Sequence, residues 1–239
     1  MKILSVISML LDYPQPELIE ARAELVQVIN QSQLNAQHKA AVNQFIEQRF
    51  NSDLMDWQAE YDGLFERGRS LSMLLFEHIH GESRDRGQAM VNLLAQYHQA
   101  GLDISAKELP DYIPLYLEFM STQGSENGRY GLEEVAHIFA LLACRLEKHQ
   151  SSYADLFHAL LSLTEIPLDL DDLREQIVDE KPDNTPKELD KVWEEEMVNF
   201  MDNAQNSCNT QRPTEAQRRD QHIPLNTELL RPSGNSERL

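Results

Sequence analysis

Residues 77–82 (EHIHGE) gather two histidines and two carboxylates, which are side chains that can ligate zinc. Side chains two positions apart in a helix do not share a face, so His78 and His80 would point in different directions. Helical zinc sites take ligands at i,i+4 spacing, and the alternative Cys-x-x-Cys pattern is also missing from this segment. The segment therefore favours the end of a helix with polar contacts over a metal site.

Residues 63–70 (GLFERGRS) imitate a phosphate-binding loop in which Arg69 takes the place of the usual lysine. Such a loop works between a strand and a helix, where backbone N–H groups converge on the phosphates. Here an amphipathic helical pattern runs directly into the motif, which favours a helix end and a turn. Ser83 lacks the Gly-x-Ser-x-Gly context of a nucleophile. We therefore expect no catalytic residues and no enzyme activity.

Residues 66–87 contain four of the 14 arginines of the chain. Arg67 and Arg69 precede an apolar run, and Arg84 and Arg86 follow it. Arginines beside carboxylates form bidentate networks that either lock helices together or bind a partner. Ion-pair networks at helix ends are common, so the chemistry taken alone favours the structural role.

Residues 108–112 (ELPDY) form a second distinctive segment. Pro110 is placed near the first turn of a helix that follows, and Asp111 can complement the dipole of that helix. The simplest interpretation of this segment is a well-formed helix N-terminus.

These segments must be positioned by helices, because apolar residues recur at helical spacing and no alternating strand pattern is evident. The two clearest stripes are Leu54, Trp57, Tyr61, Leu64 and Phe65, and then Leu132, Val135, Phe139, Leu142 and Leu146. Each stripe predicts one continuous helix, and residues 153–161 are expected to form a helical pair with the second. The predicted fold is all-α, a single-domain helical bundle of about ten helices.

The net charge is −19, from 40 acidic and 21 basic residues. Such a surface repels nucleic-acid phosphates and attracts basic peptides, so no nucleic-acid partner is expected. The segment after residue 198 carries no net charge, is rich in Asn, Gln, Ser and Pro, and cannot bury enough apolar surface to offset its chain entropy. We therefore predict a helical domain over residues 1–200 and a flexible, disordered polar tail over residues 201–239.

Neither a membrane span nor a signal peptide is expected. The longest apolar run, residues 138–144, is far shorter than the roughly 20 residues that cross a bilayer. Residues 12–14 (DYP) follow the apolar N-terminus where a cleavage site should lie. Cys144 and Cys208 provide no disulfide framework and no metal-ligand spacing. These features predict a cytoplasmic protein without direct membrane insertion.

The distinctive segments together resemble the delta-subunit family of respiratory nitrate reductase. The resemblance is carried by LFERGRSLSMLLFEHIHGESRDRGQAMVNLLAQY (residues 64–97), ELPDYIPLYLEFM (108–120) and VWEEEMVNF (192–200), and it covers about residues 1–200. Members of that family are assembly chaperones for the molybdenum cofactor of the membrane-bound enzyme. The wider group comprises the redox-enzyme maturation chaperones for exported molybdoenzymes.

The resemblance implies a chaperone that binds the apo catalytic (alpha) subunit of nitrate reductase, here called the client, at its N-terminal segment. It would hold the client for cofactor insertion before membrane docking, without a cofactor of its own. Molybdenum-cofactor delivery proteins are implied as further partners. The state of the chaperone, monomer or dimer, stays open.

The same resemblance implies a set of client-binding residues. The fingerprint of the wider group matches Glu108, Pro110, Asp111 and Tyr112, and an aromatic-x-x-Leu-Phe element matches Tyr61, Leu64 and Phe65. An acidic helical body with an aromatic stripe also suits the capture of a basic amphipathic peptide. The predicted site is Tyr61, Phe65, Arg67, Arg69, Arg84, Arg86, Glu108, Asp111, Tyr112 and Tyr116. The aromatic side chains would line a groove, the acids would pair with basic residues of the peptide, and the arginines would organise the wall or contact client acids.

Two alternatives belong to other classes. One is a metal- or nucleotide-dependent enzyme centred on His78, His80, Glu82 and residues 63–70, which a tightly bound stoichiometric metal would support. The other is a scaffold that oligomerises through its helices, which predicts a concentration-dependent mass and no client specificity.

Overall fold

The computed structural model describes residues 1–80, 84–105, 108–185 and 190. The chain divides into two units, residues 1–190 and 191–239, and only the first falls within the described residues. The predicted domain boundary at residue 200 and the predicted tail at 201–239 lie outside them. Everything below therefore concerns the first unit.

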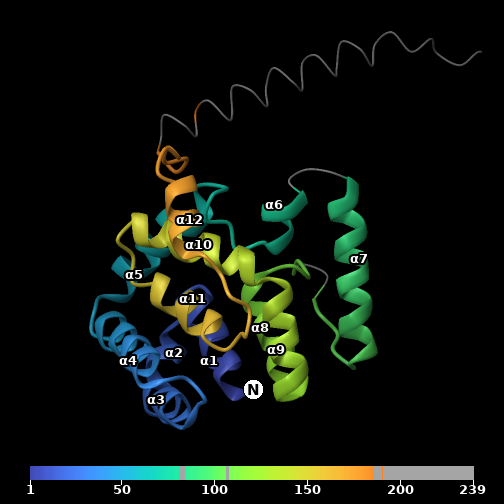
Figure 1. Cartoon of the computed structure of the whole chain (residues 1–239). Helices are drawn as coiled ribbons and strands as arrows, with labels where there is room; N and C mark the ends of the chain where they lie inside the picture. The colour runs from blue at the N-terminus through green and yellow to red at the C-terminus, as the bar shows by residue number, and fades with distance from the viewer. Residues whose placement is uncertain (81–83, 106–107, 186–189, 191–239) are drawn as a thin grey trace, which may run out of the picture. The chain divides into compact units, whose positions relative to one another are not determined.

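The described residues form twelve α-helices and one π-helix (Figure 1). They are α1 (Lys2–Leu11), α2 (Pro16–Glu20), α3 (Arg22–Gln31), α4 (Ala36–Phe50), α5 (Leu54–Tyr61), the π-helix η1 (Asp62–Glu66), α6 (Leu75–His80), α7 (Arg84–Gln99), α8 (Ile113–Thr122), α9 (Gly124–Glu134), α10 (Ala136–Lys148), α11 (Ala154–Leu161) and α12 (Leu170–Gln176). The only extended pairing within the described ranges is an isolated antiparallel bridge between Leu74 and Tyr112. The predicted all-α class is confirmed.

Side-chain caps fix where several of these helices begin. Asn35 accepts a hydrogen bond from the backbone N–H of His38 at the start of α4. Asp53 caps α5 and Asp169 caps α12, each by accepting from two backbone N–H groups of the first turn. Caps of this kind satisfy N–H groups that have no partner inside the helix, and each contributes about 1 kcal/mol.

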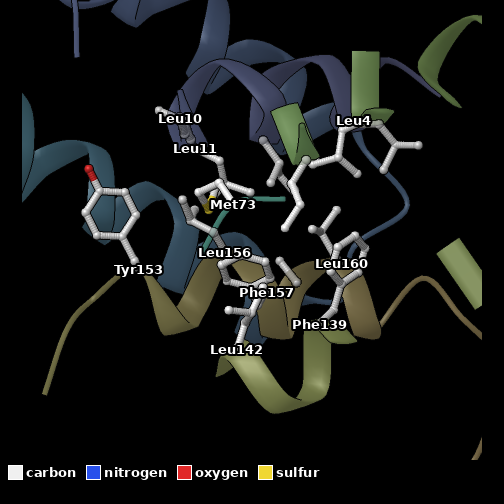
Figure 2. Close-up of a cluster of buried hydrophobic side chains, with 14 of the residues drawn as sticks. Leu4, Leu10, Leu11, Met73, Phe139, Leu142, Tyr153, Leu156, Phe157 and Leu160 are labelled. Carbon is white, nitrogen blue, oxygen red and sulfur yellow. The ribbon is translucent and has the colours of Figure 1, made fainter. Parts of the chain in front are cut away.

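The core is built around α1, which buries seven of its ten residues. This helix packs against α8, α3 and α11, and α11 packs in turn against α10 and α4. Figure 2 shows Leu4, Leu10 and Leu11 of α1 facing Leu156, Phe157 and Leu160 of α11, with Phe139 and Leu142 of α10 beyond them. The apolar N-terminus that resembles a signal peptide is thus the central core helix.

Two helices differ from the predicted continuous stripes. The stripe from Leu132 to Leu146 is divided at Val135, whose φ of −108° and ψ of 7° end α9 before α10 begins. At Gly128 of α9, an added Cβ would lie 3.0 Å from the backbone carbonyl oxygen of Met120 in α8, so the two helices pack closely at a glycine. The apolar spacing does not reveal this contact. The helix predicted from Leu54 to Phe65 likewise passes from α5 into the π-helix η1.

An aromatic cluster joins α4, α5, η1 and α11. The Tyr153 ring makes edge contacts with the rings of Phe45 and Phe65, at centroid distances of 4.9 and 5.0 Å. The indole N–H of Trp57 donates to the Tyr153 hydroxyl at 2.7 Å, and both side chains are fully buried. This hydrogen bond satisfies the single polar atom of the buried indole.

Replacing Tyr153 with Phe is expected to lower the free energy of unfolding by roughly 1–3 kcal/mol, because the buried Trp57 N–H loses its acceptor. Urea unfolding followed by tryptophan fluorescence and circular dichroism measures this loss. Tyr130→Phe is the matched control, since that ring is 50% exposed. Equal losses in the two variants would contradict the assigned role of the hydrogen bond.

Candidate functional site

The two segments that the sequence singled out are paired through their backbones. The Leu75 N–H donates to the Asp111 carbonyl at 2.9 Å, and the Ile113 N–H donates to the Met73 carbonyl at 2.8 Å. This pairing holds the loop after residue 70 against the turn that opens α8. The Arg-rich segment and the ELPDY segment therefore form one structural unit, although their paired residues are more than 30 positions apart in the sequence.

Asp111 is completely buried at this junction. Its Oδ2 accepts the Phe76 N–H at 3.1 Å and lies 3.9 Å from Nη2 of Arg86. The other terminal nitrogen of Arg86, Nη1, donates to Glu77 at 3.1 Å. Asp111 Oδ1 and Arg86 Nε are buried without a hydrogen-bond partner among the described residues. Burial raises the pKa of the Asp111 carboxyl, and the Phe76 N–H and Arg86 offset only part of this effect. The pair ties α6, α7 and the start of α8 together.

A tyrosine pair connects this junction to the end of α1. The Tyr61 hydroxyl donates to the Leu11 carbonyl at 3.1 Å and lies 3.2 Å from the Tyr112 hydroxyl. Tyr112 in turn donates to a carboxylate oxygen of Asp12 at 2.8 Å. Burial raises the pKa of both Tyr61 and Tyr112, so both hydroxyls stay protonated at neutral pH.

The remaining predicted residues separate into buried and exposed groups. Phe65 and Tyr116 are each 4% exposed, and the Tyr116 hydroxyl donates to the Gly131 carbonyl at 2.8 Å. Arg67 and Arg69 are exposed. These four side chains do not line one common groove: the aromatic pair contributes to the core, and the arginine pair lies on an outer loop.

Two further predicted residues, Glu108 and Arg84, border segments that lie outside the described residues. Glu108 is exposed and accepts the Ser105 N–H at 2.9 Å. The side chain of Arg84 lies outside the described residues. Client contact by the predicted residues therefore stays a prediction. Tyr61, Phe65, Asp111 and Tyr116 are too deeply buried to meet a peptide without a rearrangement.

Sequence reasoning missed two exposed residues at this site. Asp12, which accepts the Tyr112 hydroxyl, and Tyr13, which packs edge-on against Tyr61 at a centroid distance of 5.5 Å, directly follow α1. Leu109, in the turn before Tyr112, is 44% exposed. These residues give the junction an acidic, partly apolar outer surface. No local signal marks Asp12 and Tyr13, because only the packing of α1 against α8 and the contacts of its end with Tyr61 place them here.

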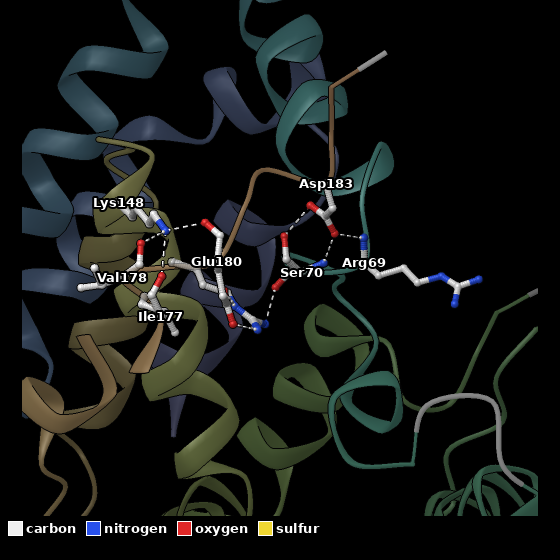
Figure 3. Close-up of polar contacts among 8 residues, drawn as sticks. Arg69, Ser70, Lys148, Ile177, Val178, Glu180 and Asp183 are labelled. Carbon is white, nitrogen blue, oxygen red and sulfur yellow. Dashed lines mark hydrogen bonds and ion pairs between the residues drawn. The ribbon is translucent and has the colours of Figure 1, made fainter. Parts of the chain in front are cut away.

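The segment at residues 63–70, whose sequence is similar to a phosphate-binding loop, binds a carboxylate of the same chain. The backbone N–H groups of Arg69 and Ser70 donate to Asp183 at 2.8 and 2.7 Å, and the Ser70 hydroxyl donates to it at 2.7 Å (Figure 3). The motif begins inside the π-helix η1 instead of following a strand, in agreement with the helical context seen in the sequence. Its anion-binding N–H groups are therefore already occupied.

The proposed metal ligands show no clustering in the part of the chain that the structure describes. His78 Nε2 lies 2.8 Å from the Ser72 carbonyl, and burial lowers the pKa of this imidazole. No group of three or more His, Cys, Asp or Glu residues that could hold a metal occurs among the described residues. The side chain of His80 and all of Glu82 lie outside them.

With the geometry established, similarity to known proteins identifies the family. The sequence matches the family model described as nitrate reductase delta subunit over residues 20–159. It is 46% identical over 217 residues to "Nitrate reductase molybdenum cofactor assembly chaperone NarJ" of Escherichia coli strain K12, covering 90% of this chain and 91% of that protein. It is 42% identical to "Probable nitrate reductase molybdenum cofactor assembly chaperone NarW" of the same strain, covering 92% of each. The chain therefore belongs to the nitrate reductase delta-subunit family, and the resemblance inferred from its motifs is confirmed.

Among solved structures, the chain is matched to the "Putative Redox Enzyme Maturation Protein" from Archaeoglobus fulgidus. The TM-score is 0.47 and the identity 21%, over 66% of this chain and 89% of that one. Within the described part of the chain, no helix has both the length and the apolar character to cross a membrane.

The pH dependence of stability tests the buried state of Asp111. Its folded-state pKa is raised above the unfolded value of about 3.9, so the folded state holds the proton more tightly. The stabilising contribution of the protonated carboxyl is therefore lost as pH rises from about 4 through the folded-state pKa. Asp111→Asn cannot ionise, so its stability relative to the wild type is expected to improve over this range.

Urea unfolding of both chains at pH 4, 5, 6 and 7 provides the measurement. Asp179→Asn is the control, since Asp179 is exposed. A stability difference between Asp111→Asn and the wild type that does not change with pH would show that Asp111 titrates normally.

Proposed function

We propose that this protein is a chaperone for the apo catalytic subunit of respiratory nitrate reductase. The chaperone binds the N-terminal segment of this client in the cytoplasm and holds the client for molybdenum-cofactor insertion before membrane docking. It acts by binding and not by catalysis. The observation that carries the proposal is the 46% identity to the E. coli chaperone over nearly the full length of both chains.

The exposed surface around the ends of α1 and α5 and the start of α8 is the part of the proposed site that a peptide can reach. Asp12 and Glu108 supply negative charge, while Tyr13, Leu109 and the half-buried Tyr112 supply apolar area. A basic amphipathic helix fits such a surface, because apolar anchors give affinity while opposite charge guides the encounter. The exposure of these residues, and their combination of negative charge with apolar area, support this surface as the place where the peptide binds.

The buried predicted residues then have a supporting role. Tyr61 and Asp111 hold the junction together through the contacts described above, with Phe65 and Tyr116 packed behind them in the core. Arg67 and Arg69 lie on the neighbouring outer loop, where they can meet acidic residues of the client. Binding sites need this kind of rigid support, since loosely held contact residues lose affinity on ordering.

Calorimetric titration with a peptide from the N-terminal segment of the nitrate reductase catalytic subunit tests the function. We expect binding in the micromolar range or tighter, and no binding of a scrambled peptide of equal charge. Equal binding of both peptides, or binding of neither, would contradict N-terminal capture.

The acidic surface is tested with the double variant Asp12→Asn/Glu108→Gln. The amide oxygens can still accept the Tyr112 hydroxyl and the Ser105 N–H, so the change removes charge while keeping both hydrogen bonds. We expect peptide affinity to fall roughly 3- to 10-fold and its salt dependence to flatten, since each screened pair contributes about 0.2–1 kcal/mol.

The matched control is Glu20→Gln/Asp56→Asn, which removes the same charge at exposed positions of α2 and α5. An equal loss of affinity in this control would assign the effect to net charge and remove the acidic surface from the site.

A further inference from the structure

Residues 177–184, here called the strap, follow α12 and cross the end of α10 (Figure 3). The Lys148 ammonium donates to the carbonyls of Ile177, Val178 and Glu180, at 2.7, 3.0 and 2.7 Å. Three acceptors match the three protons of a lysine. Lys148 therefore holds the backbone of the strap in a fixed path.

Arg145 joins the strap to the loop before α6. Its Nε and one terminal nitrogen donate to the two carboxylate oxygens of Glu180 at 2.8 and 2.7 Å, and its other terminal nitrogen donates to the Ser70 carbonyl at 2.8 Å. The planar guanidinium matches a carboxylate with two parallel hydrogen bonds, which fixes orientation as well as charge.

Asp183 makes the second carboxylate contact of the strap. Burial opposes its ionisation, but the hydrogen bonds from Ser70 and Arg69 prevail and lower the pKa of this carboxyl. A Cβ at Gly68 would lie 2.5 Å from Asp183 Oδ1, so the carboxylate fits only because residue 68 is glycine. The loop is thus shaped closely around a carboxylate.

The strap is attached almost entirely by polar contacts. Ile177 is the only buried residue among its eight, and Val178 is 65% exposed. Hydrogen bonds and partly exposed ion pairs each contribute only modest net stability, and segments with few buried apolar contacts open more readily than the core. The strap can therefore detach while the helical core stays folded.

The surface beneath the strap is complementary to an acidic peptide. A cavity of about 160 Å³ lies there, and its lining includes Ser70, Arg145, Lys148 and His149. Arg145, Lys148 and the N–H groups that donate to Asp183 concentrate hydrogen-bond donors here, which is unusual on a chain with a net charge of −19. Their spacing fits an extended segment that carries two carboxylates three residues apart, as Glu180 and Asp183 do.

We propose that Arg145, Lys148 and the loop at residues 68–70 form a docking site for an extended acidic segment of a partner protein, and that the strap occupies this site in the resting chain. The site is separate from the acidic surface proposed for N-terminal capture of the client, and it selects the opposite charge. Because the strap is tethered to α12, its effective concentration is in the millimolar range, and a partner must compete with it.

The test uses a fluorescent peptide of residues 175–186 (EQIVDEKPDNTP) and full-length chains, with binding followed by anisotropy at low salt. Glu180→Gln/Asp183→Asn weakens the strap of the protein while the peptide keeps both acids. We expect this variant to bind the peptide at least about tenfold more tightly than the wild type, since its own strap competes less. Adding Gly68→Ala to this double variant should remove its gain in peptide affinity, because the new Cβ displaces the carboxylate that the peptide places in the loop.

Two controls separate site binding from general charge effects. Glu175→Gln/Asp179→Asn removes the same charge from exposed positions that make none of the contacts described above, and it should bind the peptide as weakly as the wild type. A peptide with Gln at position 180 and Asn at position 183 should bind the Glu180→Gln/Asp183→Asn variant no more tightly than it binds the wild type.

Equal binding of the acidic peptide by all chains would overturn the proposal. Tighter binding by the double variant that persists with the peptide carrying Gln at position 180 and Asn at position 183 in place of the acids would overturn it as well. No binding by the Glu180→Gln/Asp183→Asn variant would also overturn it, because the strap would then be a fixed part of the fold. Thermal unfolding confirms that each variant is folded. If the double variant is not, Asp183→Asn alone must show the same Gly68-dependent gain.

Discussion

The burial of α1 is the constraint on which the rest of the structure depends. A helix that is apolar on most of its faces must be covered by neighbours, and here α3, α8 and α11 provide the cover. Polar contacts then orient its C-terminal half: Ser8 donates to the Pro114 carbonyl at 2.6 Å, and Tyr61 donates to the Leu11 carbonyl. The end of α1 thereby contacts both the end of α5 and the start of α8.

The candidate site is built on this fixed junction. Backbone pairing places Asp111 between three segments, where one N–H and one arginine only partly replace the water it has lost. A buried carboxylate of this kind costs stability unless it is paired, and the 3.9 Å separation from Arg86 and the unpartnered Oδ1 leave part of this cost uncompensated. The outer residues Asp12, Tyr13 and Leu109 are presented to solvent by this rigid support.

Both anion-binding features described above face carboxylates of the same chain. The Arg-rich segment places Arg86 on a buried carboxylate, and the loop that imitates a phosphate site binds Asp183. The same physical rule, that backbone N–H groups and guanidinium groups bind oxyanions, applies in both cases. Sequence context correctly excluded a phosphate loop, but the residue that occupies the loop lies more than 110 positions away and leaves no local signal.

The sequence by itself determined the helical class, most helix positions, the acidic charge and, through its long motifs, the family. These follow from periodicity, capping and residue identity, which act within a few turns of the chain. Only the tertiary structure decided that Tyr61, Phe65 and Asp111 are buried while Asp12 and Tyr13 are exposed beside them. Apolar spacing shows which residues share a helix face, but whether that face meets the core or solvent depends on helices distant in the sequence. The division of the Leu132–Leu146 stripe at Val135 is likewise absent from the apolar spacing, which continues across it.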